Sequence, residues 1–392
     1  MDYIEDGKNV LMGTYGRFPI VLERGEGPWV RDTEGKRYLD FTCGISVNNL
    51  GQCHPAIVQA VQKQAAKMFH CSNLYWSIPQ VALAEKLVSY SGLGKVFFCN
   101  SGAEANEGAI KLARKYFYDQ GQTDKNEIIT MVKSFHGRTL ATLTATGQDK
   151  VKTGFAPLMP GFHYVPYNDF EGLAAAVNDR TCAVMMEPIQ GEGGVYPADA
   201  GYLKKVRSLC EEKGLLLIFD EIQCGMGRTG TMFAYENYGV RPDIVTLAKA
   251  LGGGLPMGAF IATDEVSASF GPGSHGSTFG GNPVAAAAGN AYLETVAEKH
   301  LLDNVKTVSA YLKDQLAAID DSRIKEIRGM GLLLGMEMTV EVAPMVNSCL
   351  KQGLLLLNAG PNVIRFLPPL NITEELVDSA VAILKKVFKE EA

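Results

Sequence analysis

Short apolar runs recur along the middle of the chain and alternate with amphipathic segments. Uninterrupted apolar runs of four to eight residues are typical of strands buried on both faces. We expect such strands at residues 95–100, 127–134, 182–188, 215–220 and 243–249. Helical patterns at 101–121 and 200–214 separate some of them. Strands separated by helices predict an α/β fold with a mostly parallel, wound sheet, and a further run at 258–263 is close enough to its predecessor for a hairpin.

The parts of the chain before and after this region show different patterns of apolar, polar and glycine residues. Residues 1–45 mix short strand-like runs with turn signals, and helical patterns follow, the first after Pro55 and the second at 79–90. Residues 271–283 (GPGSHGSTFGGNP) are too rich in glycine for regular structure. A long helical region at 284–319 then leads to short strands and helices up to residue 392.

These changes predict three parts. Residues 1–48 would be an N-terminal segment that packs with the small domain, 49–283 the large domain, and 284–392 a smaller C-terminal α/β domain.

Composition narrows the class of protein. The chain has 392 residues, of which 46% are hydrophobic and 20% charged, with a net charge of −6. This balance is that of a soluble globular protein and argues against nucleic acid or an anionic membrane as partner. No apolar run reaches the roughly 18 residues of a membrane span, and the polar, acidic start predicts no secretory signal, so we expect a cytoplasmic protein. The 8 cysteines are scattered without Cys-x-x-Cys spacing, which favours reduced thiols and no metal site.

Chemistry-bearing residues stand where the predicted strands end. After the strand at 95–100, Ser101 and Glu104 fit a capping box, so a helix starts there, and its N-terminus with Gly102 suits a phosphate. After the strand at 127–134, Phe135 could stack on a flat ring and Arg138 could grip a carboxylate. Each feature alone also fits a plain helix cap, a core phenylalanine or a surface arginine.

The next three strands end in Glu187, Asp220 and Lys249. An amine at the end of an apolar run loses proton affinity by desolvation and can act as a nucleophile, although a salt bridge to either acid is the simpler interpretation. Ligands of open α/β sheets bind at the carboxyl ends of the strands. A phosphate cradle, an aromatic plate, an acid and a lysine on one edge are together what pyridoxal phosphate requires.

A competing motif lies close to these residues. Gly225–Gly230 matches the G-x-G-x-x-G pattern of dinucleotide sites and follows a strand. The segment behind it is short and aromatic, however, without the start of a long helix. A nicotinamide or flavin site is therefore the weaker hypothesis.

The motifs around these residues resemble, along nearly the whole chain, the class III, fold type I pyridoxal-phosphate-dependent aminotransferases. The motifs that carry the resemblance are TYGR (14–17), FFCNSGAEANE (97–107), SFHGRT (134–139), EPIQGEGG (187–194), DEIQ (220–223), LAK (247–249) and HGSTFGGNP (275–283). The resemblance implies a large domain that binds the cofactor and a smaller α/β domain, in agreement with the alternation of elements.

The resemblance also implies roles at the cofactor. Lys249 would form the Schiff base and carry the proton, and Asp220, helped by Glu187, would pair with the ring nitrogen. Phe135 would stack on the ring, and Gln223 would approach its phenolic oxygen. The other expected cofactor contacts are Ser101, Gly102, Ala103, Glu221, Ile222 and Thr278. In the family this threonine reaches the phosphate of the neighbouring subunit, which implies a homodimer.

At the substrate, the resemblance implies that Arg138 anchors a carboxylate, with Ser277 and Tyr15 beside it. Arg365 would hold the α-carboxylate of glutamate, and Glu192 would neutralise that arginine when the amine donor has no carboxylate there. From the residues alone, Arg365 could equally be a surface strand residue and Glu192 a loop carboxylate.

The resemblance is greatest to members that move the δ-amino group of N2-acetylornithine to 2-oxoglutarate, giving N-acetylglutamate 5-semialdehyde and glutamate in arginine biosynthesis. Ornithine, 4-aminobutyrate and succinyl-diaminopimelate remain alternative donors. An aminomutase on the same fold, or a cofactor-binding regulator without catalysis, is a further alternative.

Overall fold

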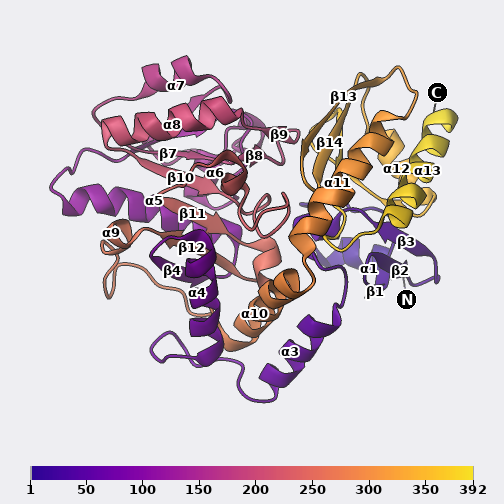
Figure 1. Cartoon of the computed structure of the whole chain (residues 1–392), viewed down its shortest axis with the longest axis horizontal. Coiled ribbons are helices and arrows are strands. Elements are labelled where there is room, and N and C mark those ends of the chain that lie inside the picture. The colour runs from indigo at the N-terminus through magenta and orange to yellow at the C-terminus, as the bar shows by residue number, and fades with distance from the viewer. Residues whose placement is uncertain (1, 392) are drawn as a thin grey trace.

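The computed structural model describes residues 2–391, and a seven-stranded sheet forms the core of its larger part, at the left in Figure 1. All strands run parallel except β12, which is antiparallel to both of its neighbours. Side by side, the strands are β4 (Lys95–Cys99), β12 (Gly258–Ala262), β11 (Ile244–Leu247), β10 (Leu216–Asp220), β7 (Thr181–Met186), β5 (Glu127–Met131) and β6 (Phe162–Val165). The predicted wound sheet and the predicted hairpin of its last two strands are confirmed.

Helices cover both faces of this sheet, which is why its strands are apolar throughout. Leu216 and Ile218 of β10 pack in one core cluster with residues of α5 (Gly102–Asp119). Leu217 and Phe219 face the opposite side and pack in a second cluster that includes residues of α8 (Ala200–Lys213). The remaining helices of this region are α3 (Pro55–Ala65), α4 (Ile78–Ser91), α6 (Leu140–Ala145), α7 (Phe170–Ala176) and α9 (Asp264–Ser267).

Short elements outside the large sheet connect its strands. A small hairpin joins β8 (Ile189–Gln190) to β9 (Tyr196–Pro197). Single 3-10 turns form η1 (Asp149–Val151), η2 (Ala234–Tyr238) and η3 (Lys249–Gly252). The predicted strand at 243–249 ends at Leu247, so Lys249 begins η3 instead of ending the strand.

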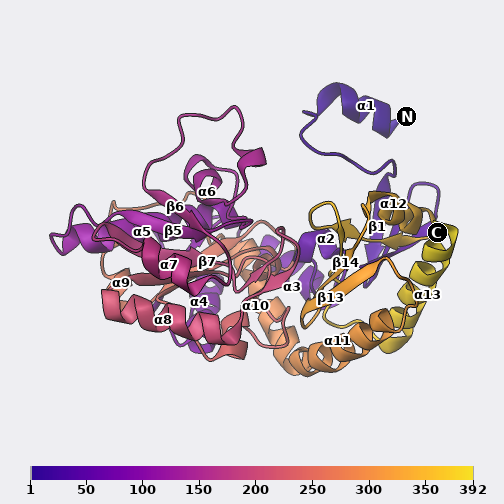
Figure 2. The ribbon, with the colours of Figure 1, turned by 90° about the horizontal axis from the view of Figure 1, so that it is seen from above.

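The two ends of the chain come together in one sheet. Three N-terminal strands, β1 (Leu22–Glu26), β2 (Trp29–Asp32) and β3 (Arg37–Asp40), are joined by β15 (Leu354–Leu355), which runs parallel to β3. The helix α1 (Tyr3–Val10) stands apart from the body in Figure 2. The short α2 (Cys43–Ser46) is a left-handed turn in which successive residues have positive φ.

A second sheet builds the C-terminal part. Its strands lie in the order β13 (Ile324–Met330), β14 (Leu333–Met338), β17 (Val363–Phe366) and β16 (Leu357–Asn358). The helical region predicted at 284–319 is two helices, α10 (Pro283–Glu298) and α11 (Leu301–Ala317), broken at His300, which has a φ of 49°. The last helices are α12 (Ala343–Lys351) and α13 (Glu374–Glu390). Boundaries at residues 48 and 283 stay a prediction.

Within residues 2–391, no helix combines the length and the apolar character needed to cross a lipid bilayer.

Candidate active site

A cavity of about 470 Å³ lies at the carboxyl ends of the strands of the large sheet. This size is in the range of small-molecule sites. Most residues singled out in the sequence line it, namely Ser101, Gly102, Ala103, Phe135, Arg138, Glu187, Glu192, Asp220, Ile222, Gln223 and Lys249. The structure therefore brings together residues from five strand ends that are up to 148 positions apart (249 − 101).

Asp220 is the last residue of β10, and its buried carboxylate is held from three sides. Oδ2 accepts a hydrogen bond from Asn106 Nδ2 at 2.7 Å, and His136 Nδ1 lies 2.8 Å from the same oxygen. Oδ1 accepts from the backbone N–H of Ile222 at 3.1 Å. These contacts on both oxygens fix the orientation of the carboxylate, so it is placed to meet a cation in the cavity.

Glu187 is the second buried acid of the cavity. Its carboxylate accepts from the backbone N–H of Phe135 at 3.0 Å and from that of Gly191 at 3.2 Å. Burial raises the pKa of Glu187 well above its usual value, and the neighbouring Asp220 raises it further. One negative charge on the two acids is therefore favoured, and Glu187 also ties the backbone of Phe135 to the end of β7.

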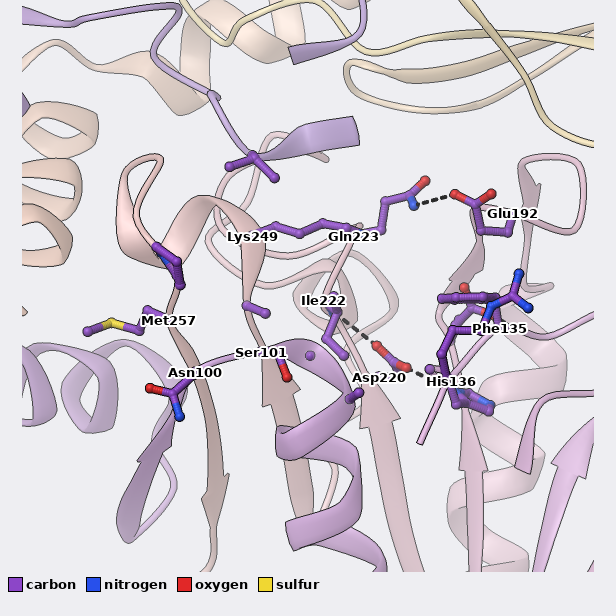
Figure 3. A pocket seen from close by; sticks show the side chains of 18 of the residues that line it. Asn100, Ser101, Phe135, His136, Glu192, Asp220, Ile222, Gln223, Lys249 and Met257 are labelled. Carbon is purple, nitrogen blue, oxygen red and sulfur yellow. Dashed lines mark hydrogen bonds and ion pairs between the residues drawn. The ribbon is translucent and has the colours of Figure 1, made fainter. Parts of the chain in front are cut away.

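Lys249 extends its side chain across the cavity toward Gln223 (Figure 3). Burial lowers the pKa of its amine, and this effect outweighs the opposing charges of Glu192 and Asp220. Within residues 2–391 no hydrogen bond is made to this amine. Its backbone has a φ of 50°, in the left-handed region that costs a non-glycine residue energy. The amine is therefore poised to lose its proton and act as a nucleophile.

The N-terminus of α5 forms one wall of the cavity. The predicted capping box forms only in part: Ser101 Oγ accepts from Glu104 N at 3.2 Å, but Glu104 accepts from the N–H of Asn100 at 2.8 Å, one residue before the N-cap. The first N–H groups of the helix, those of Gly102 and Ala103, are left for a ligand. A Cβ at Gly102 would lie 2.8 Å from Ile222 Cδ1, so this close packing needs glycine. The result is a cradle for an anion.

Arg365 is hydrogen-bonded to Glu192 and Gln223, which line the cavity. It lies in β17 and is only 2% exposed, which removes the alternative of a surface strand residue. Its Nη1 donates to Glu192 Oε1 at 2.5 Å and to Gln223 Oε1 at 2.9 Å. Burial works against ionisation of Glu192, but the arginine leaves the pKa of Glu192 below its usual value. A buried cation is thus neutralised by a carboxylate that lines the cavity.

Known proteins of the same architecture were found by sequence and by structure. The family model "Aminotransferase class-III" matches residues 12–388. An acetylornithine aminotransferase of Methanocaldococcus jannaschii is 51% identical over 391 residues, 99% of this chain and 98% of that protein. Two crystal structures superpose on this chain. The N-acetylornithine aminotransferase of Stenotrophomonas maltophilia has a TM-score of 0.85 and 41% identity, and the match covers 99% of both chains. The ornithine aminotransferase of Toxoplasma gondii has a TM-score of 0.96 and 33% identity, and the match covers 100% of this chain and 96% of that chain.

This chain belongs to the class III aminotransferases.

Class III aminotransferases use pyridoxal phosphate, and the cavity fits that group. The free N–H groups at Gly102 and Ala103 suit its phosphate, and the carboxylate of Asp220 suits a protonated ring nitrogen. In Figure 3 that carboxylate lies between Phe135 and Ile222, whose apolar side chains can pack on a flat ring. When bound, the cofactor supplies an electron sink for negative charge that develops on the substrate carbon.

Not every predicted contact of the class III site lies at the cavity. The carboxylate of Glu221 faces away, and its oxygens accept from the backbone N–H groups of Ala234 at 2.6 Å and Tyr235 at 2.7 Å. Burial raises the pKa of Glu221 to about 8. In this chain the glutamate therefore stabilises the turn η2, and its neighbour Asp220 alone serves the cavity.

Three further predicted residues also lie outside the cavity. Tyr15 is exposed and lines a separate cavity between the N-terminal segment and residues such as Leu350. Ser277 Oγ accepts from Asn100 Nδ2 at 3.2 Å and from Gly280 N at 3.0 Å, and Thr278 is exposed. Their expected roles in this aminotransferase remain predictions.

Two residues of the class III site had been assigned no role from the sequence. Asn106 and His136 hold Asp220, and both are buried. Both signals were present in the sequence. Asn106 is a polar residue on the apolar face of the helix, four positions before Ile110, and His136 directly follows Phe135 at a strand end. Buried polar residues need hydrogen-bond partners, and the buried acid at the end of β10 is such a partner.

The glycine motif at 225–230 is structural in this aminotransferase. No long helix follows it, as a dinucleotide site would require. Arg228 within it is fully buried, donates to Ser46 Oγ at 3.0 Å and to the carbonyl of Leu332 at 3.0 Å, and also contacts Asn49. The motif thus joins the N-terminal segment, the large sheet and the C-terminal part.

Proposed function

We propose that this aminotransferase transfers the δ-amino group of N2-acetylornithine to 2-oxoglutarate, giving N-acetylglutamate 5-semialdehyde and glutamate, as a step of arginine biosynthesis in the cytoplasm. The observation that carries the proposal is the placement in one cavity of the Lys249 amine, which has no hydrogen-bond partner among residues 2–391, and a fixed carboxylate, Asp220. The choice of substrate is supported by relatives named acetylornithine aminotransferase that are about as long as this chain.

The residues at the cavity divide the chemistry among them. Asp220 would balance a positive charge on the cofactor ring nitrogen, because three hydrogen-bond contacts hold its carboxylate in place. Lys249, with its lowered pKa, takes the proton from the substrate carbon that bears the amine and returns it during transfer. Gln223 Nε2 donates to Glu192 Oε1 at 3.2 Å, and its second N–H would be available to the phenolic oxygen of the cofactor, while Phe135 would pack on the ring.

The mouth of the cavity suits a substrate carboxylate. A second, polar cavity of about 390 Å³ shares Phe135, Arg138 and Glu192 with the first and is also lined by Lys150 and Asn358. The guanidinium of Arg138 lies 5.5 Å from the ring centre of Phe135, next to the expected position of the cofactor. We assign the α-carboxylate of acetylornithine to Arg138, since a planar guanidinium binds carboxylates in a bidentate manner.

The pair of Arg365 and Glu192 accounts for two substrates at one site. Glutamate and 2-oxoglutarate carry a carboxylate next to the reacting carbon, and Arg365 binds it. The reacting carbon of acetylornithine carries only a hydrogen atom in that place, and Glu192 then keeps the buried arginine neutralised.

A homodimer completes the proposal. Leu74, Tyr75, Trp76 and Ile78 form an exposed apolar segment in which Trp76 is 91% exposed, and such patches mark interaction surfaces. The adjacent Asn73 donates hydrogen bonds to the carbonyls of Ser277 and Gly280, so this segment lies beside exposed Thr278. We assign Thr278 to the phosphate of the cofactor bound in the partner subunit. Ser277 and Tyr15 would lie near the substrate once the dimer is assembled.

Initial rates with four amine donors, each with 2-oxoglutarate, test the substrate. We expect kcat/KM for acetylornithine to exceed that for ornithine, 4-aminobutyrate and succinyl-diaminopimelate by about tenfold or more, since a missing charged or polar contact costs at least about 1.4 kcal/mol. A higher value for another donor would reassign the substrate, and turnover without 2-oxoglutarate would indicate an aminomutase.

A further inference from the structure

The loop that carries Glu192 is attached to the C-terminal sheet at a second point, away from Arg365. Arg328 of β13 is buried, and its guanidinium donates to the carbonyl of Gly194 at 2.7 Å (Nη2) and 3.0 Å (Nε) and to that of Val195 at 3.2 Å. It also lies 3.8 Å from the ring centre of Tyr196. One arginine therefore holds three consecutive residues of this loop.

The two arginines are in register on the same sheet. Arg328 of β13 and Arg365 of β17 are both directly opposite Gly335 of β14. In antiparallel strands, directly opposite residues project to the same face. The loop thus lies over one face of the sheet, with one arginine on each side of the glycine.

Gly335 provides the space that the loop needs. A Cβ at this position would lie 2.9 Å from Val195 Cβ, so the valine occupies the place of the missing side chain. Val195 itself is fully buried and has a φ of 55°. We call Arg328, Gly335 and Val195 the loop clamp.

We propose that the loop clamp, through Arg328, positions Glu192 for its pairing with Arg365 and so sets the preference between a donor without a carboxylate at Arg365 and a dicarboxylate substrate. The inference rests on the proposed function. Because the backbone of the loop is held at Gly194 and Val195, only the Glu192 side chain has to move when a substrate carboxylate takes its place. A preorganised loop lowers the ordering cost of re-forming the pair.

Removal of the clamp should affect the two substrates differently. In Arg328→Met the loop is released, the pair of Glu192 and Arg365 weakens, and acetylornithine then binds beside an uncompensated buried cation. Glutamate supplies its own carboxylate and is spared. We expect the ratio of kcat/KM for acetylornithine to that for glutamate, measured in the separate half-reactions, to fall by about tenfold, a coupling of the size seen between contacting residues.

Three comparisons make the test specific. Lys325→Met is the matched control, since it removes a cation that also pairs with Glu337, at 2.6 Å, but makes no hydrogen bond to the described residues of the loop. Combined with Glu192→Ala, Arg328→Met should no longer change the ratio, because it acts through Glu192. If Arg328→Met fails to fold, Arg328→Lys, which keeps the charge but cannot bridge both carbonyls, should shift the ratio in the same direction.

Amide hydrogen exchange of the peptide at 189–197 in the cofactor-free protein gives a second measurement that needs no activity. Exchange should be faster in Arg328→Met than in the unmodified protein and in Lys325→Met. An unchanged exchange rate, an unchanged ratio, or an equal shift in the Glu192→Ala background would overturn the proposal. Absence of turnover with either substrate in the unmodified enzyme would instead refute the proposed function, and the exchange experiment would still decide the clamp.

Discussion

Individual residues at this site act through a shared electrostatic arrangement. Asp220 has three donors and Glu187 two, whereas the Lys249 amine has none among the described residues. Burial raises the pKa of Glu187 well above its usual value, whereas Asp220 is held by contacts at both of its oxygens. The two carboxylates therefore have different roles although they lie in one cavity.

Asp220→Asn tests this difference. The amide cannot balance a protonated ring nitrogen, so we expect kcat to fall by about 100- to 1,000-fold, the usual cost of losing one preorganised electrostatic contact. Glu187→Gln is the matched control, because an amide resembles the protonated acid. In this variant kcat should fall by less than about tenfold. Equal losses in the two variants, measured in the same steady-state assay, would contradict the assignment.

The residues at the strand ends were predictable, but their directions were only partly so. Asp220 and Glu221 are adjacent in sequence, and both looked suitable for the cofactor. The strand places the first toward the cavity, while the following turn places the second on the N–H groups of Ala234 and Tyr235. That turn depends on how η2 packs. Ala234 is 13 residues further along the chain than Glu221, so no local pattern reveals this contact.

Among the elements, the N-terminus of α5 contributes through its backbone and not through side chains. Gly102→Ala should weaken binding of pyridoxal phosphate by about tenfold, since the added methyl group would have to displace Ile222 and the cradle with it. Absorbance titration of the apoprotein measures the dissociation constant. Gly201→Ala in the first turn of α8, where a Cβ meets nothing within 4 Å, should leave it unchanged. Equal affinity of both variants would argue against the cradle.

The antiparallel pair β13 and β14 contains an ion-pair network with a pH signature. Hydrogen bonding from Lys325, together with Arg328, lowers the pKa of Glu337 to about 2. Since the folded-state pKa is below the unfolded value of about 4.5, the stabilisation is present above pH 4.5 and is lost as the pH falls toward 2. Glu337→Gln should lower the free energy of unfolding by about 1–3 kcal/mol at pH 7.

The difference between Glu337→Gln and the unmodified protein should narrow between pH 6 and pH 3.5 in thermal melts. Glu326→Gln removes the other, more exposed carboxylate at Arg328 and should have little effect at either pH. A gap that stays constant with pH would show that the ionised form of Glu337 does not stabilise the sheet.

At the scale of the whole molecule, distant parts of the chain share one structure. Leu39 pairs with Leu354 across the sheet of β3 and β15, and Arg228 links three regions. The alternation of apolar runs was sufficient to predict the wound sheet, because each strand and helix has a local periodicity. Pairing of the two chain ends has no such local signal, since it depends on contacts more than 300 residues apart.

Association is the property of the whole molecule that the exposed segment predicts. Trp76→Asp places a charge in the apolar surface, so sedimentation should show a shift from dimer to monomer together with a large loss of activity. Tyr118→Asp, another exposed aromatic but on a separate helix, is the control and should leave the dimer intact. A fully active monomeric Trp76 variant would contradict a site shared between subunits.

The central claim is that Lys249 and Asp220 face one pyridoxal phosphate. Borohydride reduction of the protein after incubation with pyridoxal phosphate, followed by peptide mass spectrometry, tests it most directly. The account predicts a single pyridoxyl label on Lys249, with no label at this site and no turnover in Lys249→Ala. A label on another lysine, or ordinary turnover in Lys249→Ala, would contradict it.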